Sequence, residues 1–360
     1  MKLRAFRCLF IIACITMAVA GCGSRSHTSV PIAKTKIAAG MDFSLALKSD
    51  GSLWAWGRNE NGQLGLGRED WPHKANPTPR QVGTANDWAA VACDFGYSLA
   101  LKTDGSLWAW GGSTFTPTQV GTGDDWAAIT AGLALRTDGS LWALGGNNGV
   151  TPTQVGNAND WAAISGGYDH SLALKKDGSL WAWGQNGYGE LGLGSADTKA
   201  HPTPTQVGTD NDWTAVVAGY DYSLALKTDG SLWAWGWNLH DQAGLGDTTK
   251  RTSPTQVGTD SDWTAIAGGW GYNLALKRDG SLWAWGDNAN GELGPGYTAH
   301  IDSPTRIGSA TDWAAITCGA GFSLALKRDG SLWVWGYNKY GQLGLGDTKD
   351  RHVPTRATGW

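Results

Sequence analysis

Asp50-Gly51-Ser52-Leu53-Trp54-Ala55-Trp56-Gly57 is the stretch that decides the fold, because the chain contains it seven times. The other six copies begin at Asp104, Asp138, Asp177, Asp229, Asp279 and Asp329. Only Leu144 in the third copy and Val334 in the last depart from the pattern. From Asp50 to Asp329 there are 279 residues in six steps, a mean period of 46.5. A period of this length is typical of repeat architectures.

Each copy predicts a tight β-hairpin. Leu45-Ala46-Leu47 precedes the Asp-Gly step, and an apolar run follows it. Asp-Gly between two apolar runs is a strong hairpin signal, because glycine adopts positive φ without steric cost. Alternation places Trp54 and Trp56 on one face of the second strand and Leu53 and Ala55 on the other. Since both faces are apolar, we expect neighbouring copies to cover each hairpin on both sides and the tryptophans to form the core.

A complete module reads as four short extended segments with no helical periodicity. The module around Asp229 runs from Trp213, through an aromatic loop and the hairpin, to a glycine-rich arm and a connector that ends at Gly258. The modules of Asp104 and Asp138 lack the arm, and the latter also lacks the aromatic loop. The sequence therefore predicts an all-β fold with one thin sector.

The two ends of the chain complement each other. Residues 34–40 match the first segment of a module, but Lys34 stands where the other modules have tryptophan. Residues 354–360 match the connector that normally leads into that segment. We expect the ends to meet in one seam, with Trp360 replacing the missing ring. Closure into a circle would remove exposed strand edges.

The amino terminus is predicted to be a targeting segment. Residues 1–21 combine a basic head, an apolar run too short to span a bilayer and a small-residue cleavage site. Val19-Ala20-Gly21-Cys22 resembles the lipobox of bacterial lipoproteins, which implies acylation of Cys22; an ordinary cleaved signal peptide is the alternative. Residues 22–34 are then a flexible tether and residues 35–360 the folded domain. Gly23 favours the outer membrane of the bacterial cell envelope.

Charge and cysteine content narrow the function classes. Removing residues 1–21 leaves 25 Lys and Arg against 32 Asp and Glu, a net charge of −7. This balance argues against nucleic acid and against a polybasic membrane patch. Cys93 and Cys318 occupy equivalent module positions, and we expect them to lie too far apart for a disulfide.

Ser-Leu-Ala-Leu-Lys, Asp-Gly-Ser-Leu-Trp-Ala-Trp-Gly and Asn-x-x-Gly-Gln-Leu-Gly-Leu-Gly together resemble the repeat of the regulator of chromosome condensation family over about residues 35–360. The resemblance implies a seven-bladed β-propeller, here closed by the N- and C-terminal segments. The eukaryotic founder is a nucleotide-exchange factor for a small GTPase and uses an inserted wedge. No module here is long enough to hold one, so we expect no GTPase partner. The chain is also similar, in repeat and export, to the secreted propeller that inhibits β-lactamase.

No arrangement of residues indicates catalysis. The seven histidines have no metal-ligand spacing, and no nucleophile elbow is present. The Gly-Gln-Leu-Gly-Leu-Gly segment recurs without a following helix, which favours turn structure over a phosphate site. The aspartate before each module tryptophan is interpreted as a turn cap. We therefore predict no enzyme activity, no metal and no cofactor.

One face of the ring is the predicted binding surface. The Asp-Gly hairpins, with their repeated Lys or Arg such as Lys227, should form a solvated rim on the opposite face. The first loops and the arms share the variable face, and they supply the candidate residues: Phe43, Phe95, Tyr97, Tyr168, His170, Tyr220, Tyr222, Trp270, Tyr272, Trp237, Tyr337 and Tyr340. Among these, the aromatic directly before serine is expected to fold inward more than the residue two positions earlier.

Aromatic rings interspersed with Asn, Asp and Arg are typical of protein interfaces. The sequence therefore predicts a lipid-anchored monomer that binds an extracytoplasmic protein, as a scaffold or an inhibitor. A carbohydrate-binding surface protein is the alternative, because Trp and Tyr faces with Asn and Asp also suit sugar rings.

Overall fold

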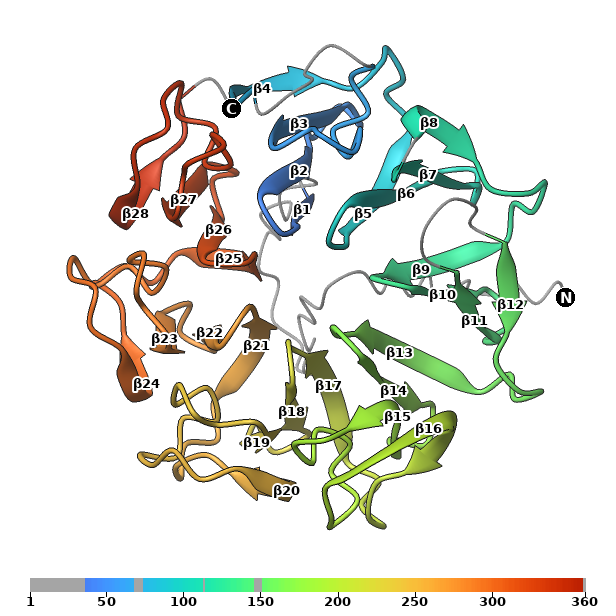
Figure 1. The fold of residues 1–360 in the computed structure, drawn as a ribbon, viewed down its shortest axis with the longest axis vertical. Coiled ribbons are helices and arrows are strands. Elements are labelled where there is room, and N and C mark those ends of the chain that lie inside the picture. Colours follow the sequence, from blue (N-terminus) through green and yellow to red (C-terminus); the bar gives the residue numbers. More distant parts are fainter. Residues whose placement is uncertain (1–35, 68–73, 113, 146–150, 359–360) are drawn as a thin grey trace, which may run out of the picture.

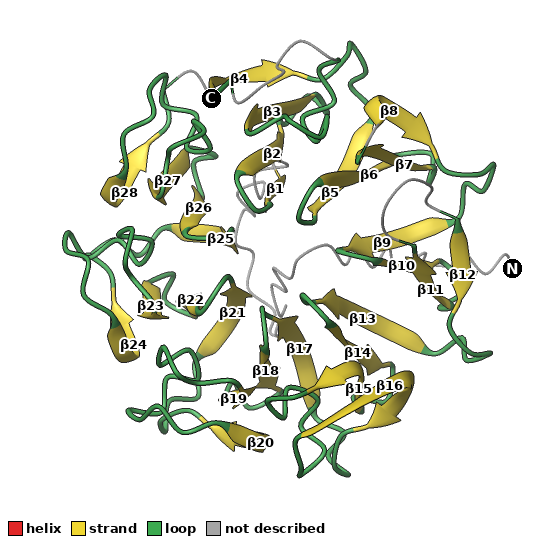
Figure 2. Cartoon of the chain, viewed as in Figure 1, coloured by secondary structure: helices red, strands yellow, loops and turns green. Residues whose placement is uncertain are grey.

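The computed structural model describes residues 36–67, 74–112, 114–145 and 151–358, which form a closed ring of seven four-stranded antiparallel sheets (Figure 1). The seven-bladed β-propeller is thereby confirmed. The described residues are all-β and contain no helix (Figure 2). In every blade the strands follow chain order, with the first strand nearest the central axis.

The strand bounds repeat from blade to blade. Blade 1 comprises β1 (Lys36–Ala39), β2 (Phe43–Leu47), β3 (Leu53–Gly57) and β4 (Asn76–Gln81). Blade 2 comprises β5 (Trp88–Cys93), β6 (Tyr97–Lys102), β7 (Leu107–Gly111) and β8 (Thr114–Gln119). Blade 3 comprises β9 (Trp126–Thr130), β10 (Leu133–Arg136), β11 (Leu141–Leu144) and β12 (Pro152–Gln154). Blade 4 comprises β13 (Trp161–Gly166), β14 (His170–Lys175), β15 (Leu180–Asn186) and β16 (Asp197–Gln206).

The remaining three blades keep the same order. Blade 5 comprises β17 (Trp213–Ala218), β18 (Tyr222–Lys227), β19 (Leu232–Gly236) and β20 (Arg251–Gln256). Blade 6 comprises β21 (Trp263–Gly268), β22 (Tyr272–Lys277), β23 (Leu282–Gly286) and β24 (Ile301–Arg306). Blade 7 comprises β25 (Trp313–Cys318), β26 (Phe322–Lys327), β27 (Leu332–Gly336) and β28 (Arg351–Arg356).

The repeated octapeptide forms the hairpin between the second and third strands. In blade 1 the Asp50 carboxylate accepts hydrogen bonds from the backbone amide (2.9 Å) and the hydroxyl (2.6 Å) of Ser52, which hold the pKa of Asp50 below its ordinary value. The same hydroxyl accepts the Trp54 Nε1 hydrogen at 2.9 Å. Gly51 has φ +82°, and a Cβ there would lie 2.0 Å from the carbonyl oxygen of Asn86. The turn therefore requires glycine for both its conformation and its space.

The second tryptophan of the octapeptide joins one blade to the arm of the blade before it. Trp56 is fully buried, and its Nε1 donates to the carbonyl oxygen of Gln342 at 2.7 Å. Ser44 donates to the same oxygen at 2.8 Å. The same indole bond recurs from Trp110 to Gln63, from Trp235 to Glu190, from Trp285 to Gln242 and from Trp335 to Glu292. The expected interlocking of adjacent sheets by tryptophan is thus present.

The first tryptophan of each pair lies instead beside the repeated basic residue. In blade 5, Lys227 Nζ lies 4.7 Å from the ring centroids of both Trp213 and Trp233, and 3.2 Å from an Asp212 carboxylate oxygen. The Lys227 side chain is only 10% exposed. The expected solvated rim is therefore wrong for this position. The aspartate carboxylate pairs with the lysine, while its backbone carbonyl accepts the Thr228 amide at 2.8 Å.

Replacing Lys227 with methionine is expected to lower the free energy of unfolding by about 1 kcal/mol. The change removes a cation between two indole rings and leaves two carboxylates without their partner, although solvent screening limits the effect. The measurement is the urea midpoint. Lys199→Met is the matched control, because Lys199 is exposed and makes no described ion pair. Equal midpoints for the two variants would contradict a stabilising role for the tryptophan-bound lysine.

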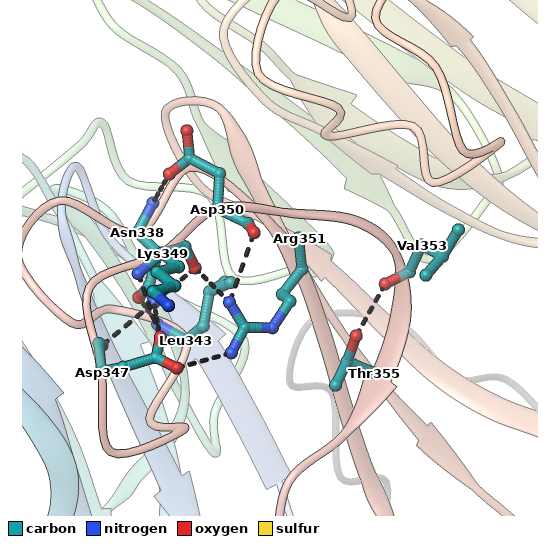
Figure 3. Close-up of polar contacts among 8 residues, drawn as sticks. All are labelled: Asn338, Leu343, Asp347, Lys349, Asp350, Arg351, Val353 and Thr355. Carbon is teal, nitrogen blue, oxygen red and sulfur yellow. Dashed lines mark hydrogen bonds and ion pairs between the residues drawn. The ribbon is translucent and has the colours of Figure 1, made fainter.

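A conserved contact within each arm holds it in place, and blade 7 shows the arrangement (Figure 3). The buried side chain of Asn338 accepts the Leu343 amide at 2.9 Å and donates to the carbonyl oxygens of Asp347 (3.1 Å) and Lys349 (2.9 Å). Arg351 then pairs with Asp347 at 2.7 Å. One buried amide therefore connects both ends of the arm, which explains the asparagine after the hairpin.

The ring closes where the arm of blade 7 lies against blade 1. The Gly346 amide donates to the carbonyl oxygen of Pro77 at 2.7 Å, and the Asn76 amide donates to that of Tyr340 at 3.1 Å. Blades 1 and 7 each consist of one continuous segment, so the described part of the seam exchanges no strand. The predicted role of Trp360 and the position of Lys34 lie outside the described residues.

The thin sector falls at blades 2 and 3, as predicted. Only two residues separate β7 from β8, and the third blade ends in a three-residue β12. Both sheets nevertheless keep four strands. Blade 3 is also where Leu144 replaces the second tryptophan, next to a blade that has no arm to supply an acceptor carbonyl. Cys93 and Cys318 are not joined in a disulfide, as expected.

Candidate functional site

The antiparallel order of each blade places the first loops and the arms on one face of the ring, which we call the variable face. Four aromatic side chains from four different blades meet there over the central axis. Phe95 lies 4.8 Å from Tyr168 and 6.1 Å from Trp270, measured between ring centroids. Tyr220 lies 4.4 Å from Tyr168 in a stacked arrangement and 4.9 Å from Trp270 edge to face. We call Phe95, Tyr168, Tyr220 and Trp270 the central aromatic cluster.

The short loop of blade 3 allows this cluster to form. Phe95 belongs to blade 2 and Tyr168 to blade 4, so the contact between them passes over the blade between. That blade has only Ala131 and Gly132 between its first two strands and brings no side chain to the axis larger than a methyl group. The deletion noted in the sequence therefore joins two blades that are not neighbours.

Small residues surround a cavity of about 130 Å³ beside the cluster. All seven blades contribute to its wall, through the inner ends of their first strands and the loops that follow. The lining includes Cys93, Cys318, glycines and alanines, together with the four rings of the cluster. The cavity is smaller than the usual pocket for a drug-sized ligand, so the exposed rings above it are the larger contact surface.

The exposure of the cluster marks it as a contact surface. Tyr168 is 44% exposed and Trp270 is 40% exposed, while Phe95 and Tyr220 are half-buried. Such a group of rings offers much apolar area with little rotamer entropy to lose on binding. These four residues were all predicted site residues.

A second aromatic group lies further from the axis between blades 4 and 5. Tyr188 and Trp237 have ring centroids 5.8 Å apart, and Trp237 lies 5.0 Å from His240. Tyr188 is 43% exposed. Trp237 was a predicted site residue, and Tyr188 lies on the same predicted variable face.

Tyr337 and Tyr340, both predicted, lie at the seam between blades 7 and 1. Arg58 Cζ lies 5.0 Å from the ring centroid of Tyr340, and Arg58 Nη1 lies 3.1 Å from an Asp42 carboxylate oxygen. Burial raises the pKa of Tyr337, with smaller contributions from Asp42 and Tyr340. The structure does not bring these two tyrosines into the central aromatic cluster.

The predicted residues that begin the second strand of each blade mostly lie inside the protein. Phe43, Tyr222 and Tyr272 are fully buried, His170 is 3% exposed and Tyr97 is half-buried. The Tyr222 hydroxyl lies 2.8 Å from the carbonyl oxygen of Tyr272 in the next blade. Burial, followed by the nearby Asp94, raises the pKa of Tyr97. These side chains join adjacent blades. Only part of the predicted set of residues is therefore exposed and available to a partner.

Acidic side chains beside the aromatics were missed as site residues. Burial raises the pKa of Asp221 to about 6, and the carboxylates of Glu190 and Asp169 add to the effect. Burial also raises the pKa of Glu190, which is 1% exposed, and that of Glu292 to about 7. The sequence did contain one sign of these acidic groups: Glu190 and Glu292 occupy an arm position where the other arms have glutamine.

Comparison with known proteins identifies the family to which this fold belongs. The chain is a closed seven-bladed β-propeller built from one repeat. It belongs to the family of RCC1-like domains, whose profile matches residues 130–359. Profiles of the regulator of chromosome condensation (RCC1) repeat match residues 50–101 and 35–63.

Among curated proteins, the ultraviolet-B receptor UVR8 of Arabidopsis thaliana is 28% identical over 211 residues, which are 59% of this chain and 43% of the receptor. The chain thus matches less than half the length of this relative. Among solved structures, human WBSCR16 has a TM-score of 0.74 at 22% identity, covering 85% of this chain and 94% of that one. Yeast RCC1 (Prp20), solved with Kap60 bound, has a TM-score of 0.73 at 22% identity, covering 96% and 91%. These two structural likenesses show the fold alone.

The described residues contain no group of three or more His, Cys, Asp or Glu side chains placed to hold a metal ion. Among those same residues, the structure has no helix with the length and apolarity that a membrane crossing requires.

Proposed function

We propose that this propeller is a binding protein that holds another protein against the central aromatic cluster, as a scaffold or an inhibitor. The observation that carries the proposal is the convergence of four partly exposed rings, from four blades, on one point of the variable face. Membership of the RCC1-like domain family, which the chain shares with relatives such as the ultraviolet-B receptor UVR8, supports a binding role. Binding rather than catalysis is the function that these side chains suit.

The proposal includes the cellular location predicted from the sequence. Acylation at Cys22 and a tether up to residue 34 would present the ring at the surface of a bacterial membrane. Gly23, as the sorting residue, favours the outer membrane, and the partner would then be an extracytoplasmic protein. Residues 22–34 lie outside the described part of the chain, so this element rests on the lipobox alone. Radiolabelled palmitate incorporation that depends on Cys22 is the direct measurement.

Replacing Tyr220 and Trp270 together with alanine is expected to weaken partner binding by about 4 kcal/mol, roughly 2 kcal/mol for each ring. Both side chains pack on other members of the cluster rather than in a blade core, so the urea midpoint should stay near that of the wild type. The partner is first isolated from envelope extract by immobilised protein, and its affinity is then measured by calorimetry.

Tyr297→Ala is the matched control, because Tyr297 is 50% exposed and lies in the arm of blade 6 away from the cluster. Loss of affinity in the control, or undiminished affinity in the double variant, would overturn the proposed surface. A small GTPase recovered as the partner would overturn the expectation that none binds.

A carbohydrate ligand remains the alternative. Sugar rings require free aromatic faces, whereas Tyr168 and Tyr220 stack on each other with an interplanar angle of 24°. This geometry favours a protein partner. Binding of the wild-type chain to a glycan array, lost in the double alanine variant, would instead support the carbohydrate alternative.

A further inference from the structure

The repeat allows two junctions of the ring to be compared position by position. Each arm packs against the following blade, so the junction of blades 7 and 1 and the junction of blades 4 and 5 are built from equivalent residues. Asp42 corresponds to Asp221, because each directly precedes the first residue of the second strand. Tyr340 and Tyr188 hold the same place in their arms, and Arg58 and Trp237 both follow the last glycine of the third strand. The pairs are Asp42 with Asp221, Tyr340 with Tyr188, and Arg58 with Trp237.

At the junction of blades 7 and 1, this set of positions holds a guanidinium group. Arg58 Nη1 lies 3.1 Å from Asp42 Oδ2, and its Nη2 pairs with Glu60. The same guanidinium lies over the ring of Tyr340, with 5.0 Å between Cζ and the centroid. A planar cation between a carboxylate and an aromatic face satisfies both partners.

At the junction of blades 4 and 5, the acceptor groups are present without a cation. Asp221 is half-buried, and its charge is close enough to those of Glu190 and Asp169 for each to raise its pKa. Glu190 replaces the Gln342 of the other junction and adds a carboxyl group that is 1% exposed. Its Oε2 accepts the Tyr188 amide at 2.7 Å, so its contribution to a bound cation is mainly its charge. Among the described residues, no Lys, Arg or His side chain forms an ion pair with Asp169, Glu190 or Asp221.

The aromatic wall of this second junction is in place. The ring centroids of Tyr188 and Trp237 lie 5.8 Å apart, and the His240 ring lies edge to face with Trp237 at 5.0 Å. Asp221 directly follows Tyr220, a member of the central aromatic cluster. The acidic group therefore continues the surface already proposed for the partner. We call Asp169, Tyr188, Glu190, Asp221 and Trp237 the 4–5 notch.

We propose that the 4–5 notch binds an arginine side chain of the partner protein, in the way that blade 1 holds its own Arg58. The inference rests on the proposed function and specifies the chemistry of the partner. Arginine fits better than lysine, since its guanidinium can stack on an aromatic face while it donates to two carboxylates. Its arrival would also neutralise negative charge that is partly removed from water.

The test uses a probe that is independent of the partner. N-acetyl-arginine amide is titrated into the folded chain, and saturation transfer from protein to probe is measured by NMR. N-acetyl-citrulline amide, which is nearly isosteric and uncharged, is the comparison probe. The wild type is expected to give at least fivefold more transfer to the arginine probe. Equal transfer to both probes would overturn the proposal.

Three variants locate the probe. Trp237→Arg introduces a guanidinium of the protein at the position equivalent to Arg58 and should reduce transfer at least fivefold. Glu190→Gln should also reduce it and should fold, because Gln342 occupies the same place in another arm. Glu292→Gln is the matched control, since blade 7 has Gly321 in place of the notch aspartate. Unchanged transfer in the first two variants, or an equal reduction in the control, would contradict this location.

The two proposals can fail separately. Loss of partner affinity in the Tyr220 and Trp270 double variant, with no selective arginine binding, would support the central aromatic cluster and overturn the notch. Selective arginine binding with undiminished partner affinity in that double variant would support the notch and overturn the cluster.

Discussion

Replacing Trp56 with leucine is expected to lower the free energy of unfolding by about 3 kcal/mol. The indole is fully buried at the seam, so leucine leaves a cavity. The change also removes the hydrogen bond to the carbonyl oxygen of Gln342, which then keeps only the Ser44 hydroxyl. The measurement is the midpoint and slope of urea unfolding, followed by tryptophan fluorescence.

The same substitution at Trp183 is the control, and it should cost about 1 kcal/mol less. Trp183 faces blade 3, which has no arm, and the described residues offer its Nε1 no hydrogen-bond acceptor. Its indole is 8% exposed rather than fully buried. Leu144 already occupies the equivalent position in blade 3 beside an absent arm. Equal losses at Trp56 and Trp183 would show that the arm carbonyl contributes nothing measurable.

Replacing His170 with phenylalanine is expected to remove an acid sensitivity of up to about 3 kcal/mol. The His170 side chain is 3% exposed, and burial lowers its pKa to about 4. Ser223 donates its hydrogen to the carbonyl oxygen of Glu190, so His170 Nε2 donates to Ser223 Oγ at 3.0 Å. The folded protein therefore keeps the ring neutral.

The sign follows from the two protonation states. Below pH 6.5 the unfolded chain binds a proton at His170, whereas the folded chain binds it only near pH 4 and below. The histidine contribution is complete above pH 6.5 and is lost as the pH falls through that window, by about 1.4 kcal/mol per pH unit. Stability of the wild type and of His170→Phe is compared by urea unfolding from pH 7 to pH 4. Glu292 has the opposite shift and is common to both proteins, so parallel profiles would contradict the assignment to His170.

Most of the fold could be predicted from the sequence because one local solution is repeated. Seven Asp-Gly turns and paired tryptophans specify a hairpin that must be covered on both faces, and that requirement leads to a ring. The blade count and the missing arms follow by counting. What the sequence did not reveal is the pairing of module lysines such as Lys227 with two indole rings and an aspartate. In blade 5, Asp212 and Trp213 precede Lys227 by 15 and 14 positions and Trp233 follows it by six. By itself the lysine looked like a surface residue.

The site was predictable only as a set of candidates. Burial distinguishes the candidates that pack between blades from those that reach the surface. The sequence does not show which rings point into the neighbouring blade. Tyr222 and Tyr220 are two residues apart, yet one lies in the blade interface and the other on the surface. The meeting of Phe95 with Tyr168 depends on a deletion in a third module, which has no signature of its own beyond a short loop. The acidic group around Glu190 could not be predicted, because the sequence does not show which aspartates lie near that side chain.

The links between blades run in one direction, since every arm contacts the blade that follows it. The modules of blades 2 and 3 lack the arm in the sequence, so the described residues on both sides of blade 3 include no arm-to-blade link of this kind. The contact of Phe95 with Tyr168 spans that same interval on the variable face. A partner that covers both rings would therefore also bridge the arc of the ring that lacks arm links, and we expect partner binding to stabilise that arc.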